Sequence, residues 1–375
     1  MIKSIRYIFQ AIILVFLSSC HHTDVPHTDK LNRTIILYMG ADNNLNVEAY
    51  QKIEQISSGW EINSTHKLLI YIDTPYGNGP KLLEVTGRGD KGYKTLKLYP
   101  PVNSADCNAF HSVIQEVVNL YPSQSYGLVV FSHASGWLPA HTYDFPRSII
   151  IDQDDEMELD DFAKAIPDNL FDFIVFEACN MASIEVAYEL RNKTSYILAS
   201  AAPILSPGFT YIYKNSINYL FDDPKSGLIK FAESYMSYFQ ANTGIFRSAT
   251  ISLVKTLELD CLALIVKQIK QTTHKKISVE LLQTYDDCLE GPYYFFDFEQ
   301  YYNLLTDSKL KEQLRENLSR TVIFKASTEN YSVNGGTVPI CSHSGLSTYI
   351  EQEQYQELNS SYSKLQWYKA IQNNM

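Results

Sequence analysis

The stretch YGLVVFSHASGW at residues 126–137, together with FIVFEACNM at residues 173–181, decides the fold. Each stretch begins with an uninterrupted apolar run, which is typical of a strand buried on both faces of a parallel sheet. Similar runs stand at 34–39, 67–73 and 196–200, and helical periodicity appears between them at 45–56, 105–120, 159–166 and 181–190. Strands alternating with helices predict an α/β fold, a largely parallel sheet flanked by helices on both faces.

Polar residues follow both of these strands directly, and they include a histidine and a cysteine, which can act as an acid–base group and as a nucleophile. In open α/β sheets, sites lie beyond the carboxyl ends of the strands, which makes His133 and Cys179 candidates. Their separation suits a crossover between neighbouring parallel strands, so we expect them on one edge. Cys179 also stands just before the helix predicted at 181–190, whose N-terminus would favour a thiolate. Such a pair fits a hydrolase dyad, although a small buried core cysteine fits the spacing as well.

Composition narrows the class of protein. The chain has 375 residues and a net charge of −11. Only 19% of its residues are charged and 13% are aromatic, which excludes a disordered chain. Because there is no basic surplus to neutralise phosphates, nucleic acid is not an expected partner. The sequence GRGDKG at 87–92 precedes a strand-like rather than a helical stretch, and it predicts a hairpin turn. Without a Pro/Gly/Ser linker, residues 33–375 form one domain, with a core at about 33–255 and a C-terminal elaboration at about 256–375.

The N-terminus indicates an exported protein. Lys3 and Arg6 precede an apolar run at 7–17, which is shorter than the roughly 20 residues that span a bilayer. The run ends in Leu-Ser-Ser-Cys20, which resembles a bacterial lipobox; an ordinary signal peptide with an incidental cysteine is the alternative. We therefore expect a signal peptide at 1–19, a lipid-anchored tether at 20–32, and a place in the bacterial cell envelope, periplasmic or surface-facing. Five cysteines remain, an odd number, so at least one thiol stays free.

Several stretches together resemble one family. HASGW at 133–137, EACNMASIEVAYEL at 177–190 and ILASAAPILSPGFTY at 197–211 are similar to the clostripain-like cysteine peptidases of the caspase/gingipain type of fold. ILYMGADNNLN at 36–46 and HSGLSTYI at 343–350 support the resemblance. It implies that His133 is the catalytic histidine, that Cys179 is the nucleophile, and that the backbone N–H groups of Ala134 and Cys179 form the oxyanion hole. The family usually has glycine where Ala134 stands, so the hole requires a backbone there that alanine tolerates.

The resemblance also assigns roles to residues around this pair. The acidic residue two positions before the cysteine lines a pocket for Arg or Lys at P1; here it is Glu177, and capping of the following helix is its alternative role. Many members are processed at a basic residue between the histidine and the cysteine. Arg147-Ser148, after Pro146, is the candidate site, against an ordinary surface arginine.

The functional hypothesis is a monomeric cysteine endopeptidase that cleaves proteins or peptides after Arg or Lys without a cofactor. One alternative is a weak or inactive relative that serves as a binding lipoprotein, and the family departures at Ala134 and Glu177 favour it. Another is an α/β lipoprotein with an unrelated binding role. Residues 152–158 (DQDDEME) lack EF-hand spacing and predict an exposed acidic loop; a calcium requirement stays open. No GxSxG elbow accompanies Ser135, which argues against a serine mechanism.

Overall fold

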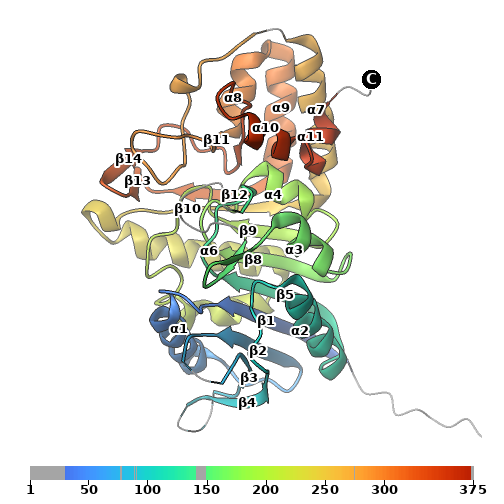
Figure 1. The fold of residues 1–375 in the computed structure, drawn as a ribbon, viewed down its shortest axis with the longest axis vertical. Helices are drawn as coiled ribbons and strands as arrows, with labels where there is room; N and C mark the ends of the chain where they lie inside the picture. Colours follow the sequence, from blue (N-terminus) through green and yellow to red (C-terminus); the bar gives the residue numbers. More distant parts are fainter. Residues whose placement is uncertain are drawn as a thin grey trace, which may run out of the picture.

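A nine-stranded sheet forms the centre of the computed structural model, which describes residues 30–76, 78–87, 89, 91–140, 149–273 and 275–372 (Figure 1). Its strand order is β12-β10-β9-β8-β5-β1-β2-β3-β4, and the run from β9 to β2 is parallel, whereas the strands outside it pair antiparallel. The strands of this sheet are β1 (Leu31–Gly40), β2 (His66–Asp73), β3 (Lys81–Val85), β4 (Tyr93–Leu98), β5 (Ser123–Phe131), β8 (Phe171–Glu177), β9 (Thr194–Ala199), β10 (Thr250–Lys255) and β12 (Val322–Ser327). This confirms the predicted fold class.

Helices cover both faces of the sheet. Side chains alternate across each strand, so the apolar strands present an apolar surface on both faces, and helices bury each surface. In β1, Ile36 and Tyr38 enter one apolar core, and Ile35 and Leu37 enter the other. The second core is closed by α1 (Asn46–Gly59), α5 (Tyr213–Ser216) and α6 (Pro224–Gln240). The first core is closed by α2 (Cys107–Leu120), α3 (Leu159–Ala165), α4 (Ile184–Glu189), α7 (Leu259–Thr272), α8 (Phe298–Leu305), α9 (Ser308–Thr321), α10 (Gln356–Tyr362) and α11 (Gln366–Ile371).

The C-terminal part extends the first core beyond the edge of the sheet (Figure 1). Here α7 packs against α9 and α11, and α11 also contacts α4. Within this part β12 returns to the main sheet beside β10, so the chain after residue 255 is continuous with the core. Three small two-stranded sheets complete the fold: β6 (Ile150–Asp152) with β7 (Asp155–Met157), β11 (Phe296–Asp297) with β15 (Ser347–Thr348), and β13 (Asn330–Val333) with β14 (Gly336–Pro339).

Two local predictions concern the segments at 87–92 and 152–158. The hairpin around residues 87–92 is confirmed, since β3 and β4 pair antiparallel. The expected exposed acidic loop at 152–158 is right only in part: Asp154 and Asp155 are exposed, but β6 and β7 form a hairpin there and Asp152 is only 2% exposed. No helix in the described part of the chain is long and apolar enough to cross a membrane. Cys20, Arg147 and Ser148 lie outside the described residues, as does the signal peptide at 1–19.

Asp73, at the end of β2, lies in a buried acidic cluster at the carboxyl edge of the sheet. Burial and the neighbouring Asp152 carboxylate together raise the pKa of Asp73 to about 8. Asp152 is held from the other side by the backbone N–H of Ser104. Asp73 therefore keeps its proton at neutral pH, because an ionised carboxylate there would be repelled by the neighbouring charge in a buried site.

This cluster predicts a pH-dependent stability. Because the folded state raises the pKa of Asp73, it binds the proton more tightly than the unfolded chain does. The stabilisation is complete below the unfolded pKa of about 4 and is lost as the pH rises through about 8. Asp73→Asn should therefore raise the thermal midpoint relative to wild type at pH 8.5, with a gain that shrinks steadily toward pH 4. Thermal unfolding across this range measures the effect, and a pH-independent difference would contradict it.

Candidate active site

The pairing of β5 with β8 brings the two candidate catalytic residues together. The strands are parallel neighbours, and Phe131 lies opposite Glu177 in the register. His133 and Cys179 each follow two residues later, so they leave the sheet side by side at its carboxyl edge. Both are half-buried, and both line two adjoining pockets of about 320 and 600 Å³. This confirms that the strand ends place a histidine and a cysteine at one edge.

A third residue, Asn44, orients the histidine. It stands in the loop between β1 and α1, and β1 is the neighbour of β5 on the side away from β8. The Asn44 Oδ1 atom lies 2.6 Å from His133 Nε2. Since a carbonyl oxygen only accepts, this contact places a hydrogen on Nε2, and Nδ1 is then the basic nitrogen of the neutral ring. Asn44 therefore selects the tautomer whose Nδ1 can take a proton from a thiol.

Cys179 lies on a tight turn that its neighbours hold in place. Asn180 adopts a left-handed φ of 59°, and its side-chain amide donates to the carbonyls of Ala201 (3.0 Å) and Tyr285 (2.8 Å). The Cys179 sulfur accepts a hydrogen bond from the backbone N–H of Ile204 at 3.3 Å. An N–H donor at this distance favours the thiolate over the thiol. All five cysteines in the described part of the chain are free thiols.

The helix expected directly after Cys179 begins later than predicted. α4 starts at Ile184, because the Ser183 side chain accepts from the Val186 N–H at 3.2 Å and caps the helix there. The cysteine is thus separated from the first helical turn, and the Ile204 N–H, rather than a helix end, contacts the sulfur. The same cap disfavours the alternative role of Glu177 as the capping residue of this helix.

The histidine loop accommodates alanine at position 134. Among the described residues other than glycine, only Gln153, Asn169 and Asn180 have a positive φ, so the Ala134 backbone is one that alanine adopts without strain. Gly136, by contrast, has a φ of 66°, and a Cβ there would lie 2.8 Å from the Asn180 carbonyl oxygen. Glycine is needed where the histidine loop crosses the cysteine loop. The oxyanion role of the Ala134 and Cys179 N–H groups stays a prediction.

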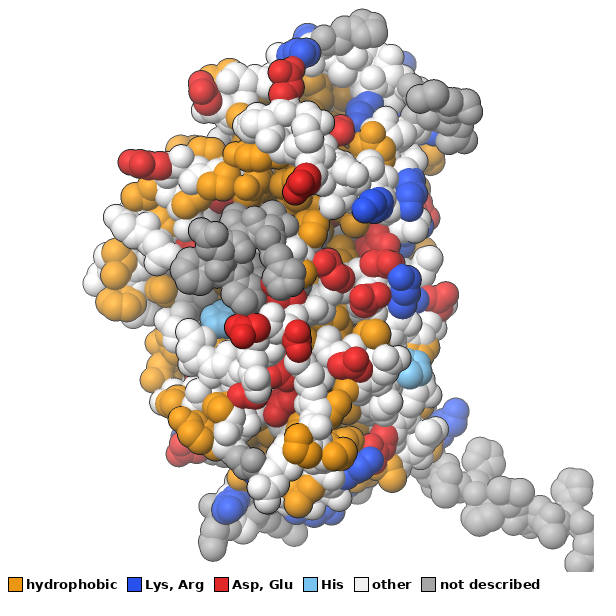
Figure 2. Space-filling model, viewed as in Figure 1, with side chains coloured by type: hydrophobic (Ala, Val, Ile, Leu, Met, Phe, Trp, Pro, Cys, Tyr) orange, Lys and Arg blue, Asp and Glu red, His pale blue; other side chains and the backbone are white. Residues whose placement is uncertain are grey.

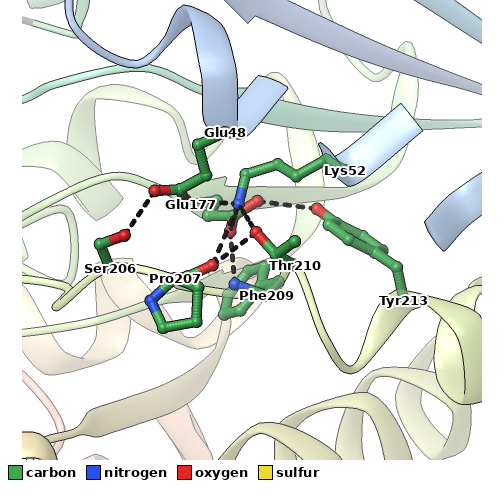
Figure 3. A network of polar contacts seen from close by, with 8 residues as sticks. All are labelled: Glu48, Lys52, Glu177, Ser206, Pro207, Phe209, Thr210 and Tyr213. Carbon is green, nitrogen blue, oxygen red and sulfur yellow. Dashed lines mark hydrogen bonds and ion pairs between the residues drawn. The ribbon is translucent and has the colours of Figure 1, made fainter. Parts of the chain in front are cut away.

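Glu177 lies beneath the smaller pocket in a polar network (Figure 3). Its Oε1 accepts from the Lys52 ammonium at 2.7 Å and from the Phe209 N–H, and its Oε2 accepts from the Tyr213 hydroxyl at 2.9 Å. Burial raises the pKa of Glu177, and the charge of Lys52 opposes that rise. Glu177 therefore lies at the base of the smaller pocket, with its carboxylate engaged by the protein itself; its contact with substrate stays a prediction.

Sequence reasoning missed Asn44, Glu48 and Lys52. Lys52 carries the clearest signal, because it stands in the apolar stripe of α1 beside Ala49, Ile53 and Ile56, where a lysine needs a buried partner. Glu48 precedes it by one helical turn, a spacing that allows an ion pair, and their atoms are 2.7 Å apart. Asn44 stands in the ILYMGADNNLN stretch, but nothing local marks it as the partner of His133.

Comparison with known proteins agrees with this geometry. The Clostripain family profile matches residues 37–373. An inactive zymogen C11 protease from Parabacteroides distasonis has a similar structure, with a TM-score of 0.81 and 30% identity over 92% of this chain and 99% of that chain. A secreted C11 cysteine protease from Bacteroides thetaiotaomicron, solved with an irreversible peptide inhibitor, has a TM-score of 0.79 and 28% identity over 91% of this chain and 99% of that chain.

Clostripain of Hathewaya histolytica is 25% identical in an alignment 231 positions long, which covers 52% of this chain and 42% of that protein. This chain thus spans less than half the length of that relative. The family profile covers most of the chain, and two solved members share the fold of more than nine-tenths of it. The chain therefore belongs to the clostripain family of cysteine peptidases.

The contact between Asn44 and His133 predicts a positioning role. Asn44→Ala should lower kcat about 5- to 10-fold, because one hydrogen bond that fixes the ring is lost. Asn44→Asp keeps an acceptor and adds a charge that raises the pKa of His133, so the alkaline limb of the kcat/KM–pH profile should move to higher pH. Peptide-hydrolysis profiles of wild type and both variants measure this. An unmoved limb in Asn44→Asp would show that position 44 does not act through the histidine.

Proposed function

We propose that the chain is a cysteine endopeptidase that cuts after Arg or Lys with His133 and Cys179. The observation that carries this proposal is the placement of both residues at one sheet edge, between two pockets that can hold the two sides of a peptide. Asn44 supports it, because a histidine held through Nε2 is oriented for proton transfer through Nδ1.

The reaction follows from these groups. The Cys179 thiolate attacks the scissile carbonyl carbon, a C–S bond forms, and the carbonyl electron pair moves onto the oxygen. The backbone N–H groups of Cys179 and Ala134 stabilise that oxyanion. His133 donates its proton to the leaving nitrogen as the C–N bond breaks. The ring then takes a proton from water, which attacks the thioester and releases the carboxylic acid and the cysteine.

Charge supports a basic P1 residue. Glu48 and Glu177 both line the 320 Å³ pocket beside Cys179, and only the Lys52 ammonium opposes them within their network. The pocket therefore carries a net negative charge, which suits a guanidinium or an ammonium group. Figure 2 shows acidic side chains gathered across the middle of the face in view. Such a surface attracts cationic peptides before they bind.

Fluorogenic peptides that differ only at P1 test the proposal. Wild type should cleave Arg and Lys substrates about 100-fold faster, by kcat/KM, than the Asp substrate, because the net negative charge of the pocket repels an anion. Cys179→Ala should abolish turnover, and Cys261→Ala, which alters an exposed thiol, is the matched control. Turnover that survives in Cys179→Ala would refute the mechanism. Absence of turnover in correctly folded wild type would favour the alternative, a binding lipoprotein of the cell envelope.

Two further proposals concern residues outside the described part of the chain. Self-cleavage after Arg147 would yield a two-chain form, which the zymogen state of the Parabacteroides distasonis relative supports. Wild type should then produce two bands on incubation, whereas Cys179→Ala stays intact.

Lipidation at Cys20 would anchor a monomer to the bacterial envelope, and Cys20→Ser should move the protein from the membrane fraction to the soluble fraction. Dialysis against a chelator tests the remaining question, a calcium requirement.

A further inference from the structure

The chain supplies its own cation to Glu177. Lys52 is fully buried, and its ammonium lies 2.7 Å from Glu177 Oε1, 2.7 Å from Glu48 Oε1 and 2.6 Å from the Thr210 hydroxyl (Figure 3). The Pro207 carbonyl is a further contact at 3.2 Å, and the ring of Phe131 lies 4.4 Å from the nitrogen. A substrate lysine bound at Glu177 would need this same set of partners. Lys52 therefore occupies the position that the ammonium group of a substrate lysine would take at Glu177.

The chain itself also covers the carboxylate of Glu177 at the base of the pocket. Its side chain is 1% exposed, and the loop at 206–210 lies directly on it. At Gly208, which has a φ of 55°, a Cβ would overlap the Glu177 carboxylate, so the backbone approaches as closely as glycine permits. An incoming guanidinium could reach this carboxylate only by displacing Lys52 or this loop. Glu177 thus holds the loop in place instead of offering a free oxygen.

The carboxylate that faces the pocket is Glu48. Its side chain is 14% exposed, its Oε1 contacts Lys52, and its Oε2 accepts a hydrogen bond from the Ser206 hydroxyl at 2.6 Å. Glu48 lines the same pocket as Cys179 and His133. Since Lys52 compensates one of the two carboxylates, the remaining negative charge lies on the wall formed by Glu48 and Ser206. A hydroxyl beside a carboxylate is easily turned toward a different acceptor when a cation arrives.

We propose that Glu48, paired with Ser206, is the residue that binds the cationic end of the P1 side chain, and that Lys52 converts Glu177 into a positioning residue. This inference rests on the proposed preference for basic P1 residues. The positioning role has a physical route: Glu177 holds the loop at 206–210, and two residues earlier the Ile204 N–H contacts the Cys179 sulfur at 3.3 Å. Loss of Glu177 should therefore disturb the nucleophile, whatever the P1 residue.

Three glutamate-to-glutamine variants of the full chain separate these roles. Glu48→Gln keeps the shape and the acceptor oxygen but removes the charge. It should lower the kcat/KM ratio of an Arg over a norleucine P1 substrate about 100-fold, since a substrate cation loses its partner. Glu54→Gln is the matched control, because Glu54 lies on the same helix and is exposed; its ratio should equal that of wild type. Glu177→Gln should lower both rates together and leave the ratio within about threefold of wild type.

The thermal midpoint and the rate of Cys179 alkylation by iodoacetamide show whether each variant is folded with an intact nucleophile. If Glu48→Gln keeps the Arg/norleucine ratio, or if Glu177→Gln loses it selectively, the inference is overturned while the basic preference of the wild type stands. If wild type itself shows no preference for Arg over norleucine, the proposed P1 preference falls, and the inference falls with it. Should Glu177→Gln fail to fold, the Glu48→Gln ratio against its Glu54→Gln control still decides the role of Glu48.

Discussion

The parallel pairing of β5 with β8 is the constraint on which the site depends. Its register sets Phe131 opposite Glu177, and this fixes which residues leave the sheet together two positions later. A slip of one residue would turn every side chain of one strand to the opposite face, and the buried apolar faces of both strands prevent such a slip. The packing of the core thus brings His133 and Cys179 to the same edge, and the left-handed residues Asn180 and Gly136 then let their two loops cross closely.

A second constraint is the buried ion pair beneath the smaller pocket. Removing two charges from water is costly, and the Lys52–Glu177 pair is tolerated because every polar atom has partners, from Glu48 to Tyr213. Breaking such a pair typically costs about 3–5 kcal/mol, so the network is fixed in the folded state. The pair joins α1 to the loop that reaches the cysteine sulfur. Stability and the geometry around Cys179 are therefore coupled through one set of contacts.

The sequence predicted what depends on local pattern. The apolar runs identified every parallel strand, and the position of His133 and Cys179 after two of them predicted their shared edge. Contacts between distant segments were not predictable: Asn44 meets a histidine 89 positions away, and Lys52 meets a carboxylate 125 positions away. The start of α4 was misplaced by three residues because the Ser183 cap overrides the apolar periodicity before it. Asp152 was expected to be exposed, yet β6 carries it into the interior.

The central claim is that the fold activates one cysteine of several free ones. Cys179 is half-buried, whereas Cys261 and Cys341 are exposed, so exposure alone would favour the latter two. Mass spectrometry of wild type treated with a peptidyl arginine chloromethylketone tests this claim directly. A single adduct is expected on Cys179, and it should disappear in His133→Ala. Adducts on Cys261 or Cys341 ahead of Cys179, or labelling of Cys179 that is unaffected by loss of the histidine, would contradict it.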